Sequence, residues 1–337
     1  MRAVVLNQPG EAVLTTVAEP RREGGDLLLK VRMVGLCGSD LNSFRGKNPM
    51  VTYPRIPGHE VAATIVEGST NDSTLAAGVN VTMSPYTSCG KCASCLRQRF
   101  NACQFNQTLG VQRDGALAEY IVMPQEKLYS SDLSIEELCL VEPLTVGFHA
   151  VSRGRVTPED KVAVLGCGGV GLGVIAASHF RGATTIGVDV DANKLSIARK
   201  AGAAHTIDTR TDNLHTRLEE LTGGRGPDVI VEAAGSPQTF RAAVEEVAFT
   251  GRVVYIGYAQ EPVAYETRLF VQKELDILGS RNATPEDFGD VIRMLEGHGF
   301  PVADAVSAIL PMEESPQALH AWSNHPASYT KIMIRVD

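Results

Sequence analysis

The chain has little aromatic and little basic character. Of its 337 residues, 6% are aromatic and one is a tryptophan, and acidic residues outnumber basic ones to give a formal net charge of −8 at pH 7. Nucleic acids and anionic membrane surfaces attract proteins that present a basic face. We therefore expect neither a nucleic acid nor a membrane as a partner.

Long apolar runs are missing too. The longest stretch of apolar residues and glycine, 162–177, is shorter than the roughly 20 residues of a membrane-spanning helix and is interrupted by glycines. The first residues contain neither an extended apolar segment nor a small-residue cleavage site, so no signal peptide is expected. We predict a cytoplasmic, reducing location, where clustered cysteines bind metal more often than they pair as disulfides.

What remains is an ordinary globular composition, with 44% hydrophobic and 21% charged residues. A chain of this length exceeds what one compact core usually holds, which predicts two domains.

Four of the seven cysteines lie within residues 88–104. Cys89, Cys92, Cys95 and Cys103 have the spacing C-x2-C-x2-C-x7-C, whose short intervals allow several thiolates to converge on one tetrahedral Zn²⁺. An iron–sulfur cluster is the main alternative, and four independent buried thiols are another. The fourth cysteine comes too late for a ferredoxin run and no proline follows it. The pattern favours a zinc ion with four protein ligands, which is a structural site because no position is open to substrate.

A second set of metal-binding side chains is not closed in this way. Cys37 in a glycine-flanked turn and the adjacent His59 and Glu60 offer a thiolate, an imidazole and a carboxylate, and Glu142 before a proline is a further acidic candidate. Three protein ligands plus water are typical of a catalytic zinc, which acts as a Lewis acid. Taken singly, each residue has a common structural explanation, such as a core cysteine or a helix entry.

A glycine-rich turn marks the nucleotide-binding half. An apolar β-run at 162–165 leads into the pattern G-x-G-x-x-G, an apolar helical stretch follows, and a second β-run ends at Asp189. This context is that of a dinucleotide-binding turn, with the pyrophosphate at the helix N-terminus and the acid on the adenosine ribose. Because Asp189 would repel a 2′-phosphate, NAD is favoured over NADP. The loop residues expected to contact the NAD are Gly166, Gly168, Gly169, Val170 and Gly171.

Strand and helix patterns continue to alternate up to about residue 280, which predicts an α/β fold with a doubly wound parallel sheet. Gly235 and Gly257 end two of its strands, at the edge where such sheets bind ligands. Arg281 and Asn282, where the chain is expected to leave this domain, are further candidates for cofactor contacts. Arg281 could alternatively bind a substrate carboxylate through paired hydrogen bonds.

The motifs GLCGSD, PGHE, the four-cysteine segment and EPLTVGFHA follow one another in an order that resembles the zinc-containing medium-chain dehydrogenase/reductases. The resemblance runs essentially end to end and is strongest to the polyol and sugar-acid branch, the relatives of sorbitol dehydrogenase. It implies a GroES-like, mostly-β catalytic domain at 1–147, a Rossmann NAD-binding domain at 148–280, and a return to the catalytic domain at 281–337.

The same resemblance assigns roles around the open metal site. It implies that Cys37 and His59 are zinc ligands, that Glu142 stands where classical alcohol dehydrogenases have a second cysteine, and that Glu60 can enter or leave the coordination shell. Which carboxylate is the resting ligand stays open.

Further roles follow from the resemblance outside the ligand set. Ser39 matches the hydroxyl that links substrate to a proton relay, Asp40 a carboxylate that supports the metal site, and Lys194 a position beside the ribose. Asn42 departs from the family, in which many members have a histidine there that passes the proton to solvent. The proton exit is therefore expected to differ.

Together these observations predict an enzyme with two zinc ions, one catalytic and one structural, that transfers a hydride between NAD and a secondary hydroxyl of a polyol, sugar or sugar acid. The family forms dimers and tetramers, so a homo-oligomer is expected. The alternatives are a simple-alcohol dehydrogenase, reduction of an activated alkene, and a non-catalytic zinc- and nucleotide-binding protein on the same fold.

Overall fold

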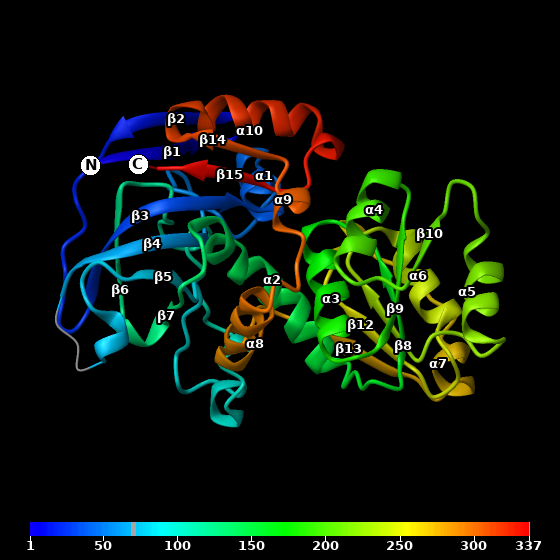
Figure 1. Ribbon diagram of the computed structural model, residues 1–337. Helices are drawn as coiled ribbons and strands as arrows, with labels where there is room; N and C mark the ends of the chain where they lie inside the picture. The colour runs from blue at the N-terminus through cyan, green and yellow to red at the C-terminus, as the bar shows by residue number, and fades with distance from the viewer. Residues whose placement is uncertain (69–71, 337) are drawn as a thin grey trace. The chain divides into compact units, whose positions relative to one another are not determined.

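The computed structural model describes residues 1–68 and 72–336, and the chain forms two compact units (Figure 1). The first unit comprises Met1–Glu142 together with the C-terminal segment from Val302, and the second is Pro143–Pro301. Among the described residues, no helix combines the length and the apolarity needed to cross a membrane.

The first unit is built on a mixed sheet. Its strands run in the order β14-β15-β3-β4-β5-β7, with β6 paired to β3, and β1 and β2 form a separate antiparallel pair. The strands are β1 (Arg2–Gln8), β2 (Glu11–Thr16), β3 (Leu27–Leu36), β4 (Glu60–Glu67), β5 (Asn80–Met83), β6 (Tyr120–Met123), β7 (Leu128–Ser130), β14 (Ala308–Pro311) and β15 (Ile332–Arg335).

Strand β3 organises this sheet. Its first six residues alternate between buried and half-buried, because successive side chains of a strand point to opposite faces. The C-terminal strand β15, red in Figure 1, pairs antiparallel with β3, with Ile332 opposite Leu36. This pairing places the start of β15 opposite Leu36, the residue directly before Cys37.

The helical segments of the first unit are short. They are α1 (Gly38–Phe44), α9 (Val302–Ala305), α10 (Ser315–Asn324) and the 3-10 turns Ser73–Leu75, Cys95–Arg97, Phe100–Ala102, Gln125–Lys127, Met312–Glu314 and Pro326–Ser328. The long helix α2 (Ile135–Arg153) contains the division between the units.

The second unit has a six-stranded parallel sheet in the order β10-β9-β8-β11-β12-β13. Its elements are β8 (Lys161–Leu165), α3 (Gly169–Phe180), β9 (Thr184–Asp189), α4 (Ala192–Lys200), β10 (His205–Asp208), α5 (Leu214–Thr222), β11 (Val229–Glu232), α6 (Pro237–Glu246), β12 (Arg252–Tyr255), α7 (Arg268–Gln272), β13 (Asp276–Gly279) and α8 (Pro285–Glu296). This is the strand order of a Rossmann sheet, in which the direction of winding reverses between β8 and β11. The predicted α/β fold class, a mostly-β unit plus a doubly wound parallel sheet, is confirmed.

Helices α2 and α3 approach each other closely through glycines. A Cβ atom added to Gly147 would lie 2.3 Å from the carbonyl carbon of Gly173, so only glycine allows the two backbones to come this near. Phe148, Leu172 and Val174, next to these glycines, are buried, so α3 packs closely against α2.

The contacts keep α8 in the second unit, whereas the sequence placed the exit from it near residue 281. One buried polar contact joins this helix to α2, with 2.9 Å between Nδ1 of His149 on α2 and Oδ2 of Asp287 on α8. Asp287 Oδ2 also accepts hydrogen bonds from the backbone N–H and the hydroxyl of Thr284, which cap α8.

Candidate active site

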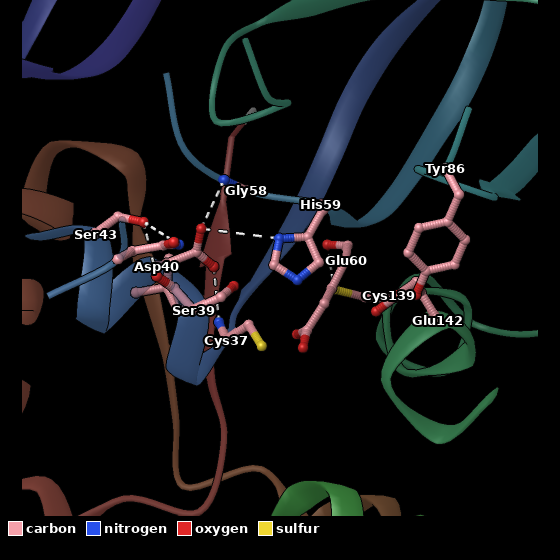
Figure 2. A network of polar contacts seen from close by, with 12 residues as sticks. Cys37, Ser39, Asp40, Ser43, Gly58, His59, Glu60, Tyr86, Cys139 and Glu142 are labelled. Atoms are coloured by element: carbon pink, nitrogen blue, oxygen red, sulfur yellow. Dashed lines mark hydrogen bonds and ion pairs between the residues drawn. The ribbon is translucent and has the colours of Figure 1, made fainter. Parts of the chain in front are cut away.

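Cys37 occupies a fixed position at the start of α1. It is the residue before the helix, and its backbone N–H donates to Asp40 Oδ2 over 2.8 Å in a capping box. The other carboxylate oxygen of Asp40 accepts from the N–H of Gly58 over 3.1 Å. Asp40 therefore ties the turn that bears Cys37 to the segment that precedes His59, as Figure 2 shows.

The imidazole of His59 is buried and lies beside Asp40, with 3.9 Å between Nδ1 and Oδ1. This distance is too long for a hydrogen bond, and Nδ1 has no hydrogen-bond partner among the described residues. Burial opposes a charged imidazole, but the nearby Asp40 and Cys37 outweigh it and raise the pKa of His59 well above its ordinary value. The ring thus lies in a strongly negative environment.

Glu60 forms a buried ion pair that the sequence analysis missed. Nζ of Lys331 lies 2.6 Å from each carboxylate oxygen of Glu60, and both side chains are almost completely buried. Burial would lower the pKa of Lys331, but the charge of Glu60 raises it above its usual value. Lys331 directly precedes β15, so the β15–β3 pairing accounts for its place here. In the sequence, the only hint is a lysine before an apolar strand.

The structure brings together three of the four predicted ligands of the open metal site. The sulfur of Cys37, a ring nitrogen of His59 and a carboxylate oxygen of Glu60 all lie within 4.8 Å of one another. Glu142 is not in this group, and its Oε1 accepts a hydrogen bond from the hydroxyl of Tyr86. Figure 2 shows Tyr86 and Glu142 facing each other. Tyr86 is a second residue that sequence reasoning did not identify.

The environment of Glu142 is closed to solvent. Both Glu142 and Tyr86 are buried. Burial raises the pKa of Glu142, and burial together with the charge of Glu142 raises that of Tyr86 well above its usual value. Glu142 lies inside α2 and is followed by Pro143, which lacks the N–H that would otherwise donate to the carbonyl of Cys139.

These residues fit a divalent cation. Thiolate, imidazole and carboxylate are the three ligand types that Zn²⁺ accepts in proteins. Four acidic groups, the buried carboxyls of Asp40, Glu60 and Glu142 and the thiol of Cys37, outnumber the two basic groups, Lys331 and the imidazole of His59. Buried charges in proteins are paired or coordinate metals, and a metal ion would offset the excess.

Ser39 lies in the first turn of α1. Its hydroxyl oxygen is shielded from solvent and has no hydrogen-bond partner among the described residues. Its backbone carbonyl accepts from the hydroxyl of Ser43 over 2.8 Å. Asn42, on the same helix, is half-buried.

The four cysteines of the 88–104 segment also come together. Their sulfur atoms lie within 4.8 Å of one another, with 3.5 Å from Cys92 to Cys95 and 3.8 Å from Cys92 to Cys103. These separations are far longer than a disulfide bond and suit a shared metal ion. A hydrogen bond from Ser94 lowers the pKa of Cys92 to about 5, whereas burial raises that of Cys95 to about 11.

The glycine turn lies between β8 and α3. Gly166 has a positive φ of 99°, and a Cβ atom added to Gly171 would lie 1.8 Å from the carbonyl oxygen of Gly166. A Cβ on Gly168 would meet nothing within 4 Å. Gly169 and Val170 begin α3, so their N–H groups lie in the first helical turn, where anions bind. The turn therefore has open space at Gly168 and close packing at Gly171.

Asp189 ends β9 beside this turn. Its Oδ2 accepts from the N–H of Cys167 over 2.8 Å, and its Oδ1 accepts from the N–H groups of Val190 and Asp191. Asp189 as a whole is half-buried. Lys194 is half-buried in the first turn of α4, which Asp191 caps.

Gly235 and Gly257, which follow β11 and β12, contact each other. A Cβ on Gly257 would lie 2.6 Å from the nitrogen of Gly235 and 2.4 Å from Oε2 of Glu232. The fully buried Glu232 accepts through Oε1 from the N–H groups of Ala234 and Gly235. Glu232, which was also missed from sequence, thus shapes the turn of Gly235.

Arg281 and Asn282 follow β13, and both are half-buried. Asn282 has a positive φ of 55°, a left-handed conformation that asparagine adopts more readily than most residues. Arg281 follows Ser280, whose hydroxyl is buried without a partner among the described residues. Both residues therefore lie beyond the carboxyl end of a sheet strand.

Comparison with known proteins identifies the family. Residues 23–132 match the alcohol dehydrogenase GroES-like domain, and residues 169–297 match the zinc-binding dehydrogenase family. The chain is 34% identical to sorbitol dehydrogenase of Bacillus subtilis, over 83% of this chain and 81% of that protein. It is 30% identical to L-galactonate-5-dehydrogenase of Escherichia coli, over 88% and 87% of the two chains. The chain belongs to the zinc-containing medium-chain dehydrogenase/reductase family.

Solved structures show the same fold with bound nucleotides. An alcohol dehydrogenase from Escherichia coli CFT073 in complex with NADH has a TM-score of 0.91 and 25% identity, covering 100% of this chain and 99% of that one. A protein from Sinorhizobium meliloti bound to NADP has a TM-score of 0.90 and 27% identity, covering 99% of each chain. Both forms of the nicotinamide cofactor therefore occur on this fold.

Proposed function

We propose that this protein is a zinc-dependent enzyme that transfers a hydride between NAD and a secondary hydroxyl of a polyol, sugar or sugar acid. The observation that carries the proposal is the convergence of Cys37, His59 and Glu60 on one point. The second unit has the strand order and glycine turn of a dinucleotide site. A metal site of open type and a nucleotide site together are what an alcohol dehydrogenase requires.

A zinc ion held by Cys37, His59 and a carboxylate would act as a Lewis acid that lowers the pKa of the substrate hydroxyl. Asp40 orients this site by fixing the backbone at Cys37 and Gly58. The buried hydroxyl of Ser39, which has no partner among the described residues, would accept the substrate proton and pass it on. Because Asn42 cannot exchange a proton at neutral pH, the exit from Ser39 runs through water, the cofactor ribose or another side chain.

The four-cysteine segment would hold a second zinc. Its four sulfur atoms lie close enough together to be the four ligands of one ion, which would then have no open position and a purely structural role. Asp189 would hold the adenosine ribose hydroxyls, and the turn from Gly166 to Gly171 would hold the pyrophosphate. Gly235, Gly257, Arg281 and Asn282 would contact the cofactor at the carboxyl ends of the strands.

The substrate class is supported by the relatives, whose names include a sorbitol, a galactonate and an erythritol/L-threitol dehydrogenase. A panel of alditols, aldoses, aldonates and simple alcohols, assayed by NADH absorbance, tests it. Turnover of alditols or aldonates is expected to exceed that of ethanol and aromatic alcohols. A preference for simple alcohols would contradict the substrate class, and no turnover of any of them would favour a non-catalytic protein.

Arg281 separates neutral from acidic substrates in the same panel. If its guanidinium binds a carboxylate, Arg281→Ala should lower kcat/KM on aldonates much more than on the matching alditols. Equal losses on both would instead assign Arg281 to the cofactor or to the structure of the loop. The family's dimers and tetramers make a homo-oligomer our expectation for this chain, which size-exclusion chromatography with light scattering would test.

A further inference from the structure

The ends of β9 and β10 place acidic and basic side chains beside the glycine turn. In this parallel pair Asp208 lies opposite Asp189, and the N–H of Thr209 donates to the carbonyl of Asp189 over 3.2 Å. Arg210, the next residue, therefore begins the loop directly beside the carboxylate assigned to the adenosine ribose. No short sequence motif contains both residues, because Arg210 lies 21 positions after Asp189.

Asp208 holds Arg210 in a fixed orientation. Its Oδ1 lies 3.1 Å from Nε of Arg210 and its Oδ2 lies 2.8 Å from Nη2, which is a two-point contact of planar groups. Oδ1 also accepts from the backbone N–H of Arg210 over 3.0 Å. The Arg210 side chain is 58% exposed, and ion pairs this exposed add little to stability. The main effect of the contact is orientation.

The guanidinium retains capacity for a further acceptor. Within residues 1–68 and 72–336, Nη1 of Arg210 has no hydrogen-bond partner, so the edge away from Asp208 is open. Asp208 raises the pKa of Arg210 most, and the charges of Asp191 and Asp189 add to it, which places all three acids within electrostatic reach. A cation thus stands among the acids at the ribose position.

We propose that Arg210 is a specificity-determining residue for the 2′-position of the cofactor's adenosine, where its open edge contacts a 2′-phosphate. The proposal rests on the nucleotide site of the proposed function. Asp189 repels a 2′-phosphate and so favours NAD, whereas Arg210 attracts that phosphate. The discrimination between NAD and NADP therefore depends on the balance between the charges of Asp189 and Arg210. Removing Asp189 leaves Arg210, oriented by Asp208, as the residue that binds the phosphate.

Isothermal titration of the zinc-loaded full-length protein with ADP and with 2′,5′-ADP tests this. Both probes carry two phosphate groups, but the second phosphate lies on the 5′-phosphate in ADP and on the 2′-hydroxyl in 2′,5′-ADP. Each variant is therefore compared with its parent protein for each probe separately, and neither probe carries nicotinamide, so binding is measured without turnover. The variants are Arg210→Ala, Asp189→Ser and the combination of both. Arg217→Ala is the matched control, because Arg217 is an exposed arginine of the same unit that forms an ion pair with Glu220.

We expect Asp189→Ser to tighten 2′,5′-ADP binding. Adding Arg210→Ala should then weaken it about tenfold, the order expected for one lost charge-assisted hydrogen bond, while ADP changes less than about twofold. Arg217→Ala should change neither affinity. Equal weakening of both nucleotides, or unchanged 2′,5′-ADP affinity in the double variant, would overturn the assignment of Arg210. Failure of the wild-type protein to bind ADP would contradict the dinucleotide site itself, and with it this inference.

Discussion

At the scale of single residues, the site around Cys37 is a small group of buried charges that depend on one another. Asp40 is buried and is stabilised by two backbone N–H groups, and burial still raises its pKa above the usual value. Glu60 instead depends on one side chain, Lys331. Removing one partner of a buried pair leaves an uncompensated charge, which costs far more than the intact pair contributes.

Replacing Lys331 with methionine should therefore destabilise the protein strongly. We expect a loss of about 3–5 kcal/mol in the free energy of unfolding, measured by urea denaturation of the zinc-loaded protein. Lys331→Arg keeps the charge and should lose much less. A loss below about 1 kcal/mol for Lys331→Met would show that Glu60 does not depend on this contact.

The pH dependence of this effect has a definite sign. The pKa of Lys331 is raised in the folded state, so its contribution is fully present below the unfolded value of about 10.4 and is lost only as the pH rises through the folded value. The difference between wild type and Lys331→Met should accordingly be the same at pH 7 and pH 9. A difference that disappears between these pH values would contradict the raised pKa.

At the scale of elements, the turn between β8 and α3 combines tight packing with open space. The Gly171 position has no room for a side chain because the carbonyl of Gly166 occupies it, whereas the Gly168 position faces open space. The two glycines therefore serve different purposes. One allows the helix to start, and the other leaves room for a ligand to approach.

Alanine at each position separates these purposes. Gly171→Ala should destabilise the fold by about 1–3 kcal/mol through overpacking, visible as a lower Tm. Gly168→Ala should leave Tm unchanged and weaken NAD binding about tenfold or more, because its Cβ would enter the space of the pyrophosphate. If Gly168→Ala bound NAD as tightly as the wild type, the open space at Gly168 would not be the pyrophosphate site.

The four-cysteine segment and the start of α1, which Cys37 precedes, are expected to bind zinc ions with different roles. Metal analysis of the purified protein should find about two zinc ions per chain. Cys95→Ser should remove one and reduce the folded yield, because that metal holds the segment together. Cys37→Ser should leave the zinc of the four-cysteine segment bound and the Tm of the protein unchanged, while abolishing turnover. Identical behaviour of the two variants would contradict the division into a structural and a catalytic ion.

Local patterns explain which parts of these elements were predictable. The spacing of the four cysteines, the His59–Glu60 pair and the glycine turn are short-range features, and the structure brings each set together as expected. Lys331 and Tyr86 are far in sequence from the groups they contact. Lys331 comes close to Glu60 through the pairing of β15 with β3, and Tyr86 contacts Glu142 on the buried part of α2. Arg210 depends in the same way on the register of β9 and β10.

At the scale of the whole molecule, the alternation of strands and helices predicts the fold class, whereas the contacts that join distant segments into units leave no local pattern. His149 on α2 and Asp287 on α8 form a buried contact within the second unit, and the return to the first unit comes at Val302. A polar pair 138 residues apart leaves no local signature in the sequence.

We expect this chain, with its zinc bound, to move a hydride from a secondary carbon of a polyol or sugar acid to NAD. The most direct measurement uses the best substrate of the panel, deuterated at the carbon that is oxidised, and determines the mass of the NADH formed. We predict one deuterium in each NADH, and no NADH from Cys37→Ser protein. NADH without deuterium, or equal turnover by Cys37→Ser, would contradict the claim.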